Sequence, residues 1–162
     1  MLPIIVPTRV IGSPPALALT LEGLEVIEVM MNDYHHYARL FTEQWQSGRG
    51  FILVEHDIVP WPGALKQLDA CQQECCAFEY PNNPIIEEPR SGWCMSLGCI
   101  KFASSLLQRV PHDITWQNRG WDELDGSVFA TLQGKVDIHV HYPPVAHVKA
   151  RSLISRFGDI PC

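Results

Sequence analysis

The sequence of 162 residues lacks several features that would place it in a specialised class of protein. Its six cysteines form no C-x-x-C pair, which argues against a thiolate zinc site. In a reducing compartment most of them are expected to be small buried residues. A basic excess is also missing, since the net charge is −6 at pH 7. This composition argues against a general affinity for nucleic acid or anionic membranes and leaves a local basic patch open.

Long apolar runs, repeats and low-complexity segments are absent as well. The apolar start of the chain carries no cationic leader and is interrupted by Pro3 and Pro7. We therefore expect neither a signal peptide nor a membrane span, and a cytoplasmic location. The hydrophobic content of 46% is enough for one sizeable core. Residues 1–162 are accordingly expected to form a single compact domain.

Strand and helix patterns alternate along the chain. Residues 3–10 and 24–31 have the pattern of strands, and the connection between them allows at most a short helix. Residues 33–47 predict a helix with Asp33 as N-cap. The continuously apolar run FILV predicts a central strand covered on both faces. Further helices are expected at 62–74, 103–110 and 121–133, and further strands at 76–81 and 136–142. Residues 93–102 are expected to form a strand followed by a turn. This alternation indicates an α/β sandwich with a mostly parallel sheet.

Three ionisable residues follow the FILV run directly. Side chains alternate along a strand, so Glu55 and Asp57 are expected to share one direction and His56 the other. Ligands of open α/β sheets bind beyond the carboxyl ends of the strands, where this pair would lie. Two neighbouring carboxylates repel each other, and a divalent cation relieves that repulsion. An ordinary acidic exit from a strand into solvent explains the pattern too.

The stretch FILVEHD, followed by IVPWPGAL, resembles the metal-binding segment of GT-A glycosyltransferases, the nucleotide-diphospho-sugar transferases. In that family a D-x-D-type motif precedes such a proline-containing turn, and Glu55-His56-Asp57 would be the motif. Glutamate stands in its first place here, so the resemblance implies Asp57 as metal ligand more firmly than Glu55. It also implies a GT-A-like α/β/α sandwich.

Other segments resemble the family in chain order. The stretch Pro7-Thr8-Arg9 resembles the one that meets the nucleotide, and the segment around Arg39 resembles the one before the motif strand. SGWCMSLGCIKF resembles the acceptor-side strand, and WDELDG the helix start that supplies a catalytic base. HVHYPPVAHV resembles the terminal strand whose histidine, His147, completes the metal site.

The resemblance implies a metal-dependent transfer of a sugar from a nucleotide-diphosphate donor, UDP-sugar favoured, to a hydroxyl acceptor. Asp57 and His147 would hold Mn²⁺ or Mg²⁺, and a histidine ligand suits Mn²⁺ somewhat better. Lys149 and Arg151 could cover the phosphates, or belong to an ordinary solvated terminus.

An inverting transfer needs a carboxylate that takes the proton of the acceptor hydroxyl. Asp125 shares a helical face with Val128 and Leu132, which makes it the first candidate. Asp122 is a second candidate and equally a helix cap. Trp93 and Trp121 could stack on sugar rings, although buried core aromatics are commoner.

Two other classes of function remain open. His139, His141 and His147 could form a mononuclear metal site for hydrolysis, or His139 and His141 could simply pack on a strand. A non-catalytic binder of sugar nucleotides would keep the pocket without the base.

Overall fold

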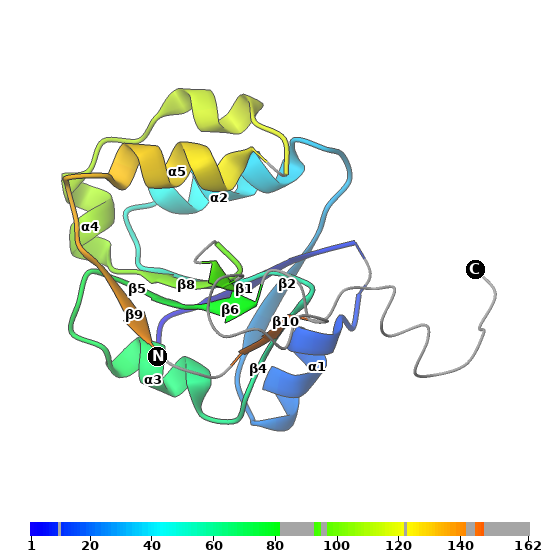
Figure 1. Ribbon diagram of the computed structural model, residues 1–162. Helices are drawn as coiled ribbons and strands as arrows, with labels where there is room; N and C mark the ends of the chain where they lie inside the picture. The colour runs from blue at the N-terminus through cyan, green and yellow to red at the C-terminus, as the bar shows by residue number, and fades with distance from the viewer. Residues whose placement is uncertain (10, 82–92, 95–96, 122, 142–144, 148–162) are drawn as a thin grey trace.

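The computed structural model describes residues 1–9, 11–81, 93–94, 97–121, 123–141 and 145–147 (Figure 1). The elements in chain order are β1 (Ile4–Thr8), α1 (Pro14–Leu21), β2 (Val26–Met30), α2 (His36–Gln46), β3 (Phe51–Val54), β4 (Ile58–Pro60), α3 (Ala64–Ala70), β5 (Cys75–Phe78), β6 (Tyr80–Pro81), β7 (Trp93–Cys94), β8 (Cys99–Phe102), α4 (Ser104–Arg109), the 3₁₀ helix η1 (Ile114–Asn118), α5 (Leu124–Leu132), β9 (Ile138–His141) and β10 (Val145–His147). No helix in these described ranges is both long and apolar enough to cross a bilayer.

A six-stranded sheet with the order β2-β1-β3-β8-β5-β9 forms the centre of the fold. The pairs β1–β2, β1–β3 and β5–β9 are parallel. Strand β8 runs antiparallel to both of its neighbours, β3 and β5. The predicted α/β sandwich with a mostly parallel sheet is confirmed.

Helices cover both faces of this sheet (Figure 1). One core cluster joins the sheet to α2, α4, η1 and α5, and a second joins it to α1 and α3. Strand β3 supplies both clusters, because Phe51 and Leu53 point into the first and Ile52 and Val54 into the second. All four side chains are buried, as the continuous apolar run predicts.

Helix α2 begins later than the sequence pattern indicates. Its first residue is His36, and Asp33 does not cap it. The Asp33 carboxylate instead accepts a hydrogen bond of 2.8 Å from the backbone N–H of His35 and pairs with Arg39 at 2.6 Å. These local bonds stabilise a turn before the helix, so the expected N-cap is wrong.

Helix α3 also begins later than expected, at Ala64 instead of Pro62. Gly63 precedes it with a φ of 85°, in the left-handed region that glycine adopts without a steric cost. A right-handed helix cannot pass through such a residue, so the Pro62-Gly63 step stays a turn.

Strand β10 lies outside the main sheet and pairs with β4 in antiparallel fashion. Its register places the backbone of His147 opposite Ile58, the residue after Asp57. The last described segment therefore returns to the acidic turn that follows β3.

An aromatic cluster around Phe41 is expected to be the main stabilising contact between α2 and the sheet. Phe41 is 1% exposed, and its ring centre lies 5.5 to 5.9 Å from those of Trp45, Phe51, Phe102 and Trp116. Phe41→Ala should lower the free energy of unfolding by about 3–5 kcal/mol in urea denaturation, through lost burial and a cavity. Trp61→Ala, at a residue 58% exposed, is the control and should change it by less than about 0.5 kcal/mol. Equal losses in both variants would contradict this assignment.

Candidate functional site

The acidic triplet lies at the carboxyl end of the sheet, next to the end of β1. Strand β3 ends at Val54, and residues 55–57 form a turn in which the N–H of Ile58 donates to the carbonyl of Glu55 at 3.0 Å. The N–H of Glu55 donates to the carbonyl of Gly98 at 2.8 Å. Glu55, His56 and Asp57 therefore lie in a turn and not on the strand, so strand alternation does not set their directions.

Trp121 lies at the centre of the side chains around this turn. Its ring meets His56 edge-on at 5.3 Å between centres and Tyr37 at 4.5 Å. The guanidinium carbon of Arg9, directly after β1, lies 5.6 Å from the centre of the same ring. This contact is a cation–π interaction, which orients a cation without neutralising it. Trp121 thus joins β1, α2 and the turn after β3; its stacking on a sugar stays a prediction.

Asp125 faces this turn from the first turn of α5. The N–H of Leu97 lies 3.4 Å from its Oδ2. Its negative charge raises the pKa of Glu55, so the two carboxylates are neighbours although they are far apart in the chain. Of the site residues predicted from the sequence, the structure thus brings together six: Arg9, Glu55, His56, Asp57, Trp121 and Asp125.

Glu55 has a strongly raised pKa. Burial is the main cause that raises its pKa to about 8, followed by the charge of Asp125 and, less strongly, that of Asp57. A hydrogen bond from Tyr37 opposes the shift, because it stabilises the ionised form. Glu55 therefore keeps its proton to a higher pH than an ordinary glutamate, and a protonated Glu55 reduces the repulsion between the carboxylates.

Other predicted residues lie at the edge of this site or apart from it. Pro7 and Thr8 are buried residues of β1, and the carbonyl of Thr8 accepts a hydrogen bond of 2.7 Å from the N–H of Met31. Arg39 is half-buried and paired with Asp33. No contact recorded among the described residues links Arg39 to Trp121 or to the acidic turn.

Some candidates cannot be placed in this site. Asp122, Lys149 and Arg151 lie outside the described residues. Trp93 and His147 are described by their backbone alone, Trp93 in β7 and His147 in β10. The backbone of β10 runs beside the turn, as the metal role predicted for His147 requires, but that role stays a prediction.

Tyr37 is the residue of this site that the sequence pattern does not reveal as functional. It is fully buried on α2, and its position on the apolar face of the helix reads as simple core packing. Its hydroxyl nevertheless meets Glu55, and its ring packs on Trp121. A tyrosine within an apolar helical stripe indicates a polar partner, but the partner itself is set by tertiary contacts.

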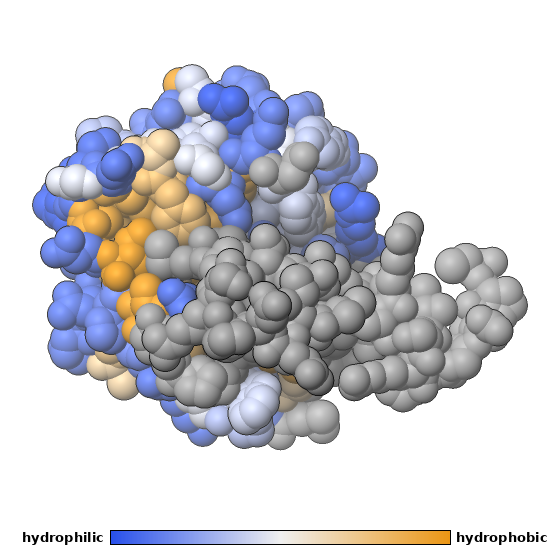
Figure 2. Space-filling model, viewed as in Figure 1, coloured by the Kyte–Doolittle hydropathy of each residue, from blue (hydrophilic) through white to orange (hydrophobic). Residues whose placement is uncertain are grey.

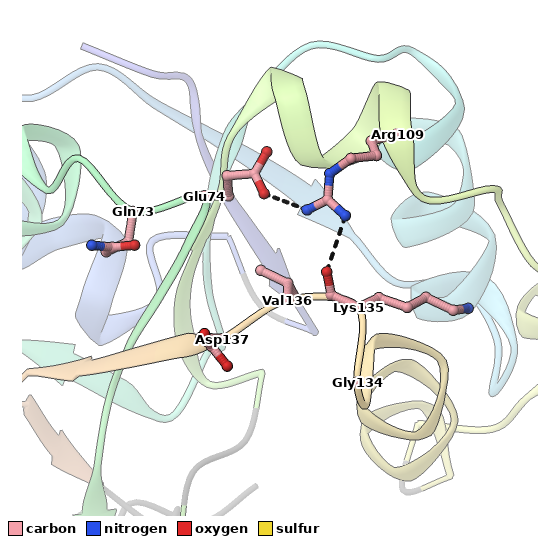
Figure 3. A pocket seen from close by; sticks show the side chains of 7 residues that line it. All are labelled: Gln73, Glu74, Arg109, Gly134, Lys135, Val136 and Asp137. Atoms are coloured by element: carbon pink, nitrogen blue, oxygen red, sulfur yellow. Dashed lines mark hydrogen bonds and ion pairs between the residues drawn. The ribbon is translucent and has the colours of Figure 1, made fainter.

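A hollow of about 360 Å³ lies elsewhere, at the opposite end of the sheet, where β5 and β9 begin. Figure 3 shows Arg109 at this hollow, in contact with Glu74 and with the carbonyl of Lys135. A hydrogen bond from Ser105 and the Arg109 pair lower the pKa of Glu74. The amino ends of parallel strands are not the usual ligand site of such sheets, and these contacts join α4 to the strands.

Comparison with known proteins shows the fold. No family model matches the chain, and no curated protein does. Among solved structures, a glycosyltransferase involved in the glycosylation of the major capsid of PBCV-1 is 11% identical with a TM-score of 0.56, over 94% of this chain and 96% of that one. The chain has a GT-A-like fold.

Two more solved structures share this fold. A197 from STIV is 12% identical with a TM-score of 0.58, over 85% of this chain and 80% of that one. A putative glucose-1-phosphate thymidylyltransferase from Bacillus anthracis is 9% identical with a TM-score of 0.50, over 98% of this chain and 78% of that one. Identities this low establish the GT-A-like arrangement of strands and helices and leave the activity to the residues of the site.

The raised pKa of Glu55 predicts a specific dependence of stability on pH. Between its usual pKa near 4.5 and its folded pKa of about 8, the folded state keeps a proton that the unfolded state releases. Stability should therefore fall as pH rises through this interval. Glu55→Gln cannot ionise, so its melting temperature should exceed that of the wild type increasingly from pH 5 to pH 8.

Melting curves at several pH values without added metal measure this difference. Glu43→Gln, at an exposed position of α2, is the matched control and should follow the wild type. A constant offset between Glu55→Gln and the wild type at all pH values would show that Glu55 is ionised throughout.

Proposed function

We propose that the protein is a glycosyltransferase that moves a sugar from a nucleotide-diphosphate donor to an acceptor hydroxyl. The observation that carries this proposal is the meeting of Arg9, the acidic turn, Trp121 and Asp125 at the carboxyl ends of β1 and β3. Ligands of open α/β sheets bind at this end. The solved glycosyltransferase with the same fold supports the assignment.

The donor set suits a hard divalent cation that is shared with a substrate. In the described part of the chain, the carboxylates near Glu55 do not form a three-ligand cage around one point. Mg²⁺ in particular is usually held by one or two carboxylates together with substrate phosphates. We therefore assign Asp57, with His147, as protein ligands of Mn²⁺ or Mg²⁺. The ion, when bound, supplies positive charge to the leaving diphosphate.

Protonation of Glu55 gives the three acids of this site different roles. The charges of Asp125 and Asp57 raise the pKa of Glu55, so a proton on Glu55 removes a third negative charge from the group. Environments that separate the titration of neighbouring acids are typical of acid–base sites. Asp57 then faces the cation, and Asp125 accepts the proton of the acceptor hydroxyl as that oxygen attacks the sugar carbon. An inverting outcome follows from a single displacement of this kind.

Arg9 and Trp121 would position the donor. The guanidinium of Arg9 is exposed and is held over the Trp121 ring, so its N–H groups can turn toward phosphate oxygens. Pro7 and Thr8 fix the end of β1 from which Arg9 projects. A UDP-sugar is the favoured donor, and a sugar or another hydroxyl compound is the acceptor.

The hydrolase alternative finds less support. The rings of His139 and His141 lie 4.6 Å apart, but the described neighbours of His141 include Cys71 and Cys76. This set differs from the three-histidine site that hydrolysis would need, and the side chain of His147 is outside the description. Turnover of a nucleotide-sugar donor distinguishes the transferase from a non-catalytic binder.

Asp57→Asn should abolish metal-dependent nucleotide binding and leave the fold intact. The change removes a full negative charge from the cation and keeps the side-chain shape. Calorimetric titration of UDP with Mn²⁺ measures the loss of binding. Asp69→Asn, near the end of α3, makes the same chemical change outside the proposed site and is the control. Unchanged affinity in Asp57→Asn, with an unchanged melting temperature, would mean that the acidic turn is a solvated strand exit.

Asp125→Asn should lower kcat by about 10²–10⁴ with little change in donor affinity, because the proton acceptor is lost. Transfer assays across a panel of UDP-sugars and acceptors measure kcat, and titration measures donor binding. Asp137→Asn, in the hollow at the other end of the sheet, is the matched control. If Asp122→Asn loses activity and Asp125→Asn keeps it, the base is Asp122.

A further inference from the structure

A second group of metal-ligating side chains lies at the edge of the sheet that β9 forms. Cys71 follows α3, Cys76 lies in β5, and His141 ends β9. One potential ligand atom from each residue lies within 4.8 Å of the other two. Both cysteines are free thiols, with their sulfur atoms 2.7 Å apart. None of the contacts that this group makes with other described residues involves the proposed transferase site.

The register of the strands explains why these residues meet. Strand β9 pairs in parallel with β5, with His139 opposite Cys76 and His141 opposite Phe78. Cys76 and Phe78 point into the core cluster that α1 and α3 cover, so both histidines belong to that face of the sheet. Cys71, at the end of α3, closes the group from above the same face.

The two nitrogens of His141 have different surroundings. Its Nδ1 lies 3.2 Å from the side-chain amide nitrogen of Gln67 on α3. Its Nε2 is buried and has no hydrogen-bond partner among the described residues. In metal-bound histidines the second nitrogen usually donates to a polar neighbour, and a half-turn of the Gln67 amide would provide that acceptor. This leaves Nε2 available to an ion.

The end of α3 is held in place by a buried lysine. The ammonium of Lys101, a residue only 3% exposed, donates a hydrogen bond to the carbonyl of Cys71. The structure records no carboxylate partner for Lys101 within its described ranges. Burial raises the pKa of the Cys76 thiol to about 12, and the positive charge of Lys101 opposes this shift.

We propose that Cys71, Cys76 and His141 bind one Zn²⁺ ion that fastens β9 to α3. Two thiolates and an imidazole are a typical zinc set, and water or the exposed His139 takes the fourth position. Zinc–sulfur bonds of about 2.3 Å place two sulfur atoms about 3.8 Å apart in a tetrahedron, so loading spreads them by about 1 Å.

The ion has a structural task at this place. Among the described strands, β9 lies at an edge of the sheet beside β5, and its residues are half-buried or exposed. Figure 2 shows apolar side chains at the surface along β9, on a face that is otherwise mostly hydrophilic where it is described. A bond from His141 to an ion held by α3 and β5 would stop this edge from fraying.

Metal analysis of the full-length chain, purified under reducing conditions, tests the proposal. We expect about one zinc ion per chain, and a thiolate-to-cobalt charge-transfer band when Co²⁺ replaces zinc. Cys76→Ser and His141→Ala should lose most of the zinc, and chelation should lower the melting temperature of the wild type but not of these variants. Cys75→Ala, whose side chain points to the opposite face, and Asp57→Asn should keep the metal.

Three outcomes would overturn the proposal. They are a reduced wild type that binds neither zinc nor cobalt, full zinc content in Cys76→Ser, and a Cys71–Cys76 disulfide in peptides of protein alkylated at cell lysis. If Cys76→Ser does not fold, Cys71→Ser at its half-buried position and the cobalt spectrum of the wild type still decide.

Discussion

The constraint on which the rest of the site depends is the cost of gathering carboxylates at the end of a buried strand. Strand β3 is covered on both faces, so Glu55 emerges from an apolar core next to Asp57 and Asp125. Water cannot screen such a group fully, and one of its acids responds by keeping a proton. The proton on Glu55 and the hydrogen bond from Tyr37 each reduce the cost of burying these carboxylates. In the proposed function, a cation bound with a diphosphate reduces it further.

Aromatic packing connects this electrostatic problem to the stability of the fold. Tyr37 lies on the same helix as Phe41 and Trp45, which pack on Phe51, Phe102 and Trp116. Its ring also supports Trp121, which holds Arg9 and His56. The orientation of the site therefore depends on a rigid core layer, as a preorganised site requires.

The two groups of potential ligands differ in chemistry as well as in place. Carboxylates at the carboxyl end of β3 suit hard cations and phosphates, whereas the thiols and imidazole beside α3 suit a soft ion. The absence of a C-x-x-C pair predicted no thiolate site, yet Cys71 and Cys76 flank the turn between α3 and β5 and meet because the chain reverses there. A spacing rule for one kind of zinc loop does not cover a site assembled from three elements.

Local pattern alone determined the layered fold and the place of the acidic turn. The uninterrupted apolar run 51–54 can only be satisfied by cover on both faces, and charged residues directly after it must lie at the strand's end. Local pattern failed where short-range bonds compete, as at the starts of α2 and α3, because turn geometry at Asp33 and Gly63 overrode helical spacing.

Tertiary structure alone decided which distant residues meet. Asp125 reaches Glu55, Trp121 reaches Arg9, and His141 reaches Cys71 only because strand order and helix packing bring separate segments to the same edge. The periodicity of apolar residues in the sequence indicates which face of its own helix or strand a side chain occupies. The element opposite that face is set by the sheet order β2-β1-β3-β8-β5-β9, which depends on the packing of the whole chain.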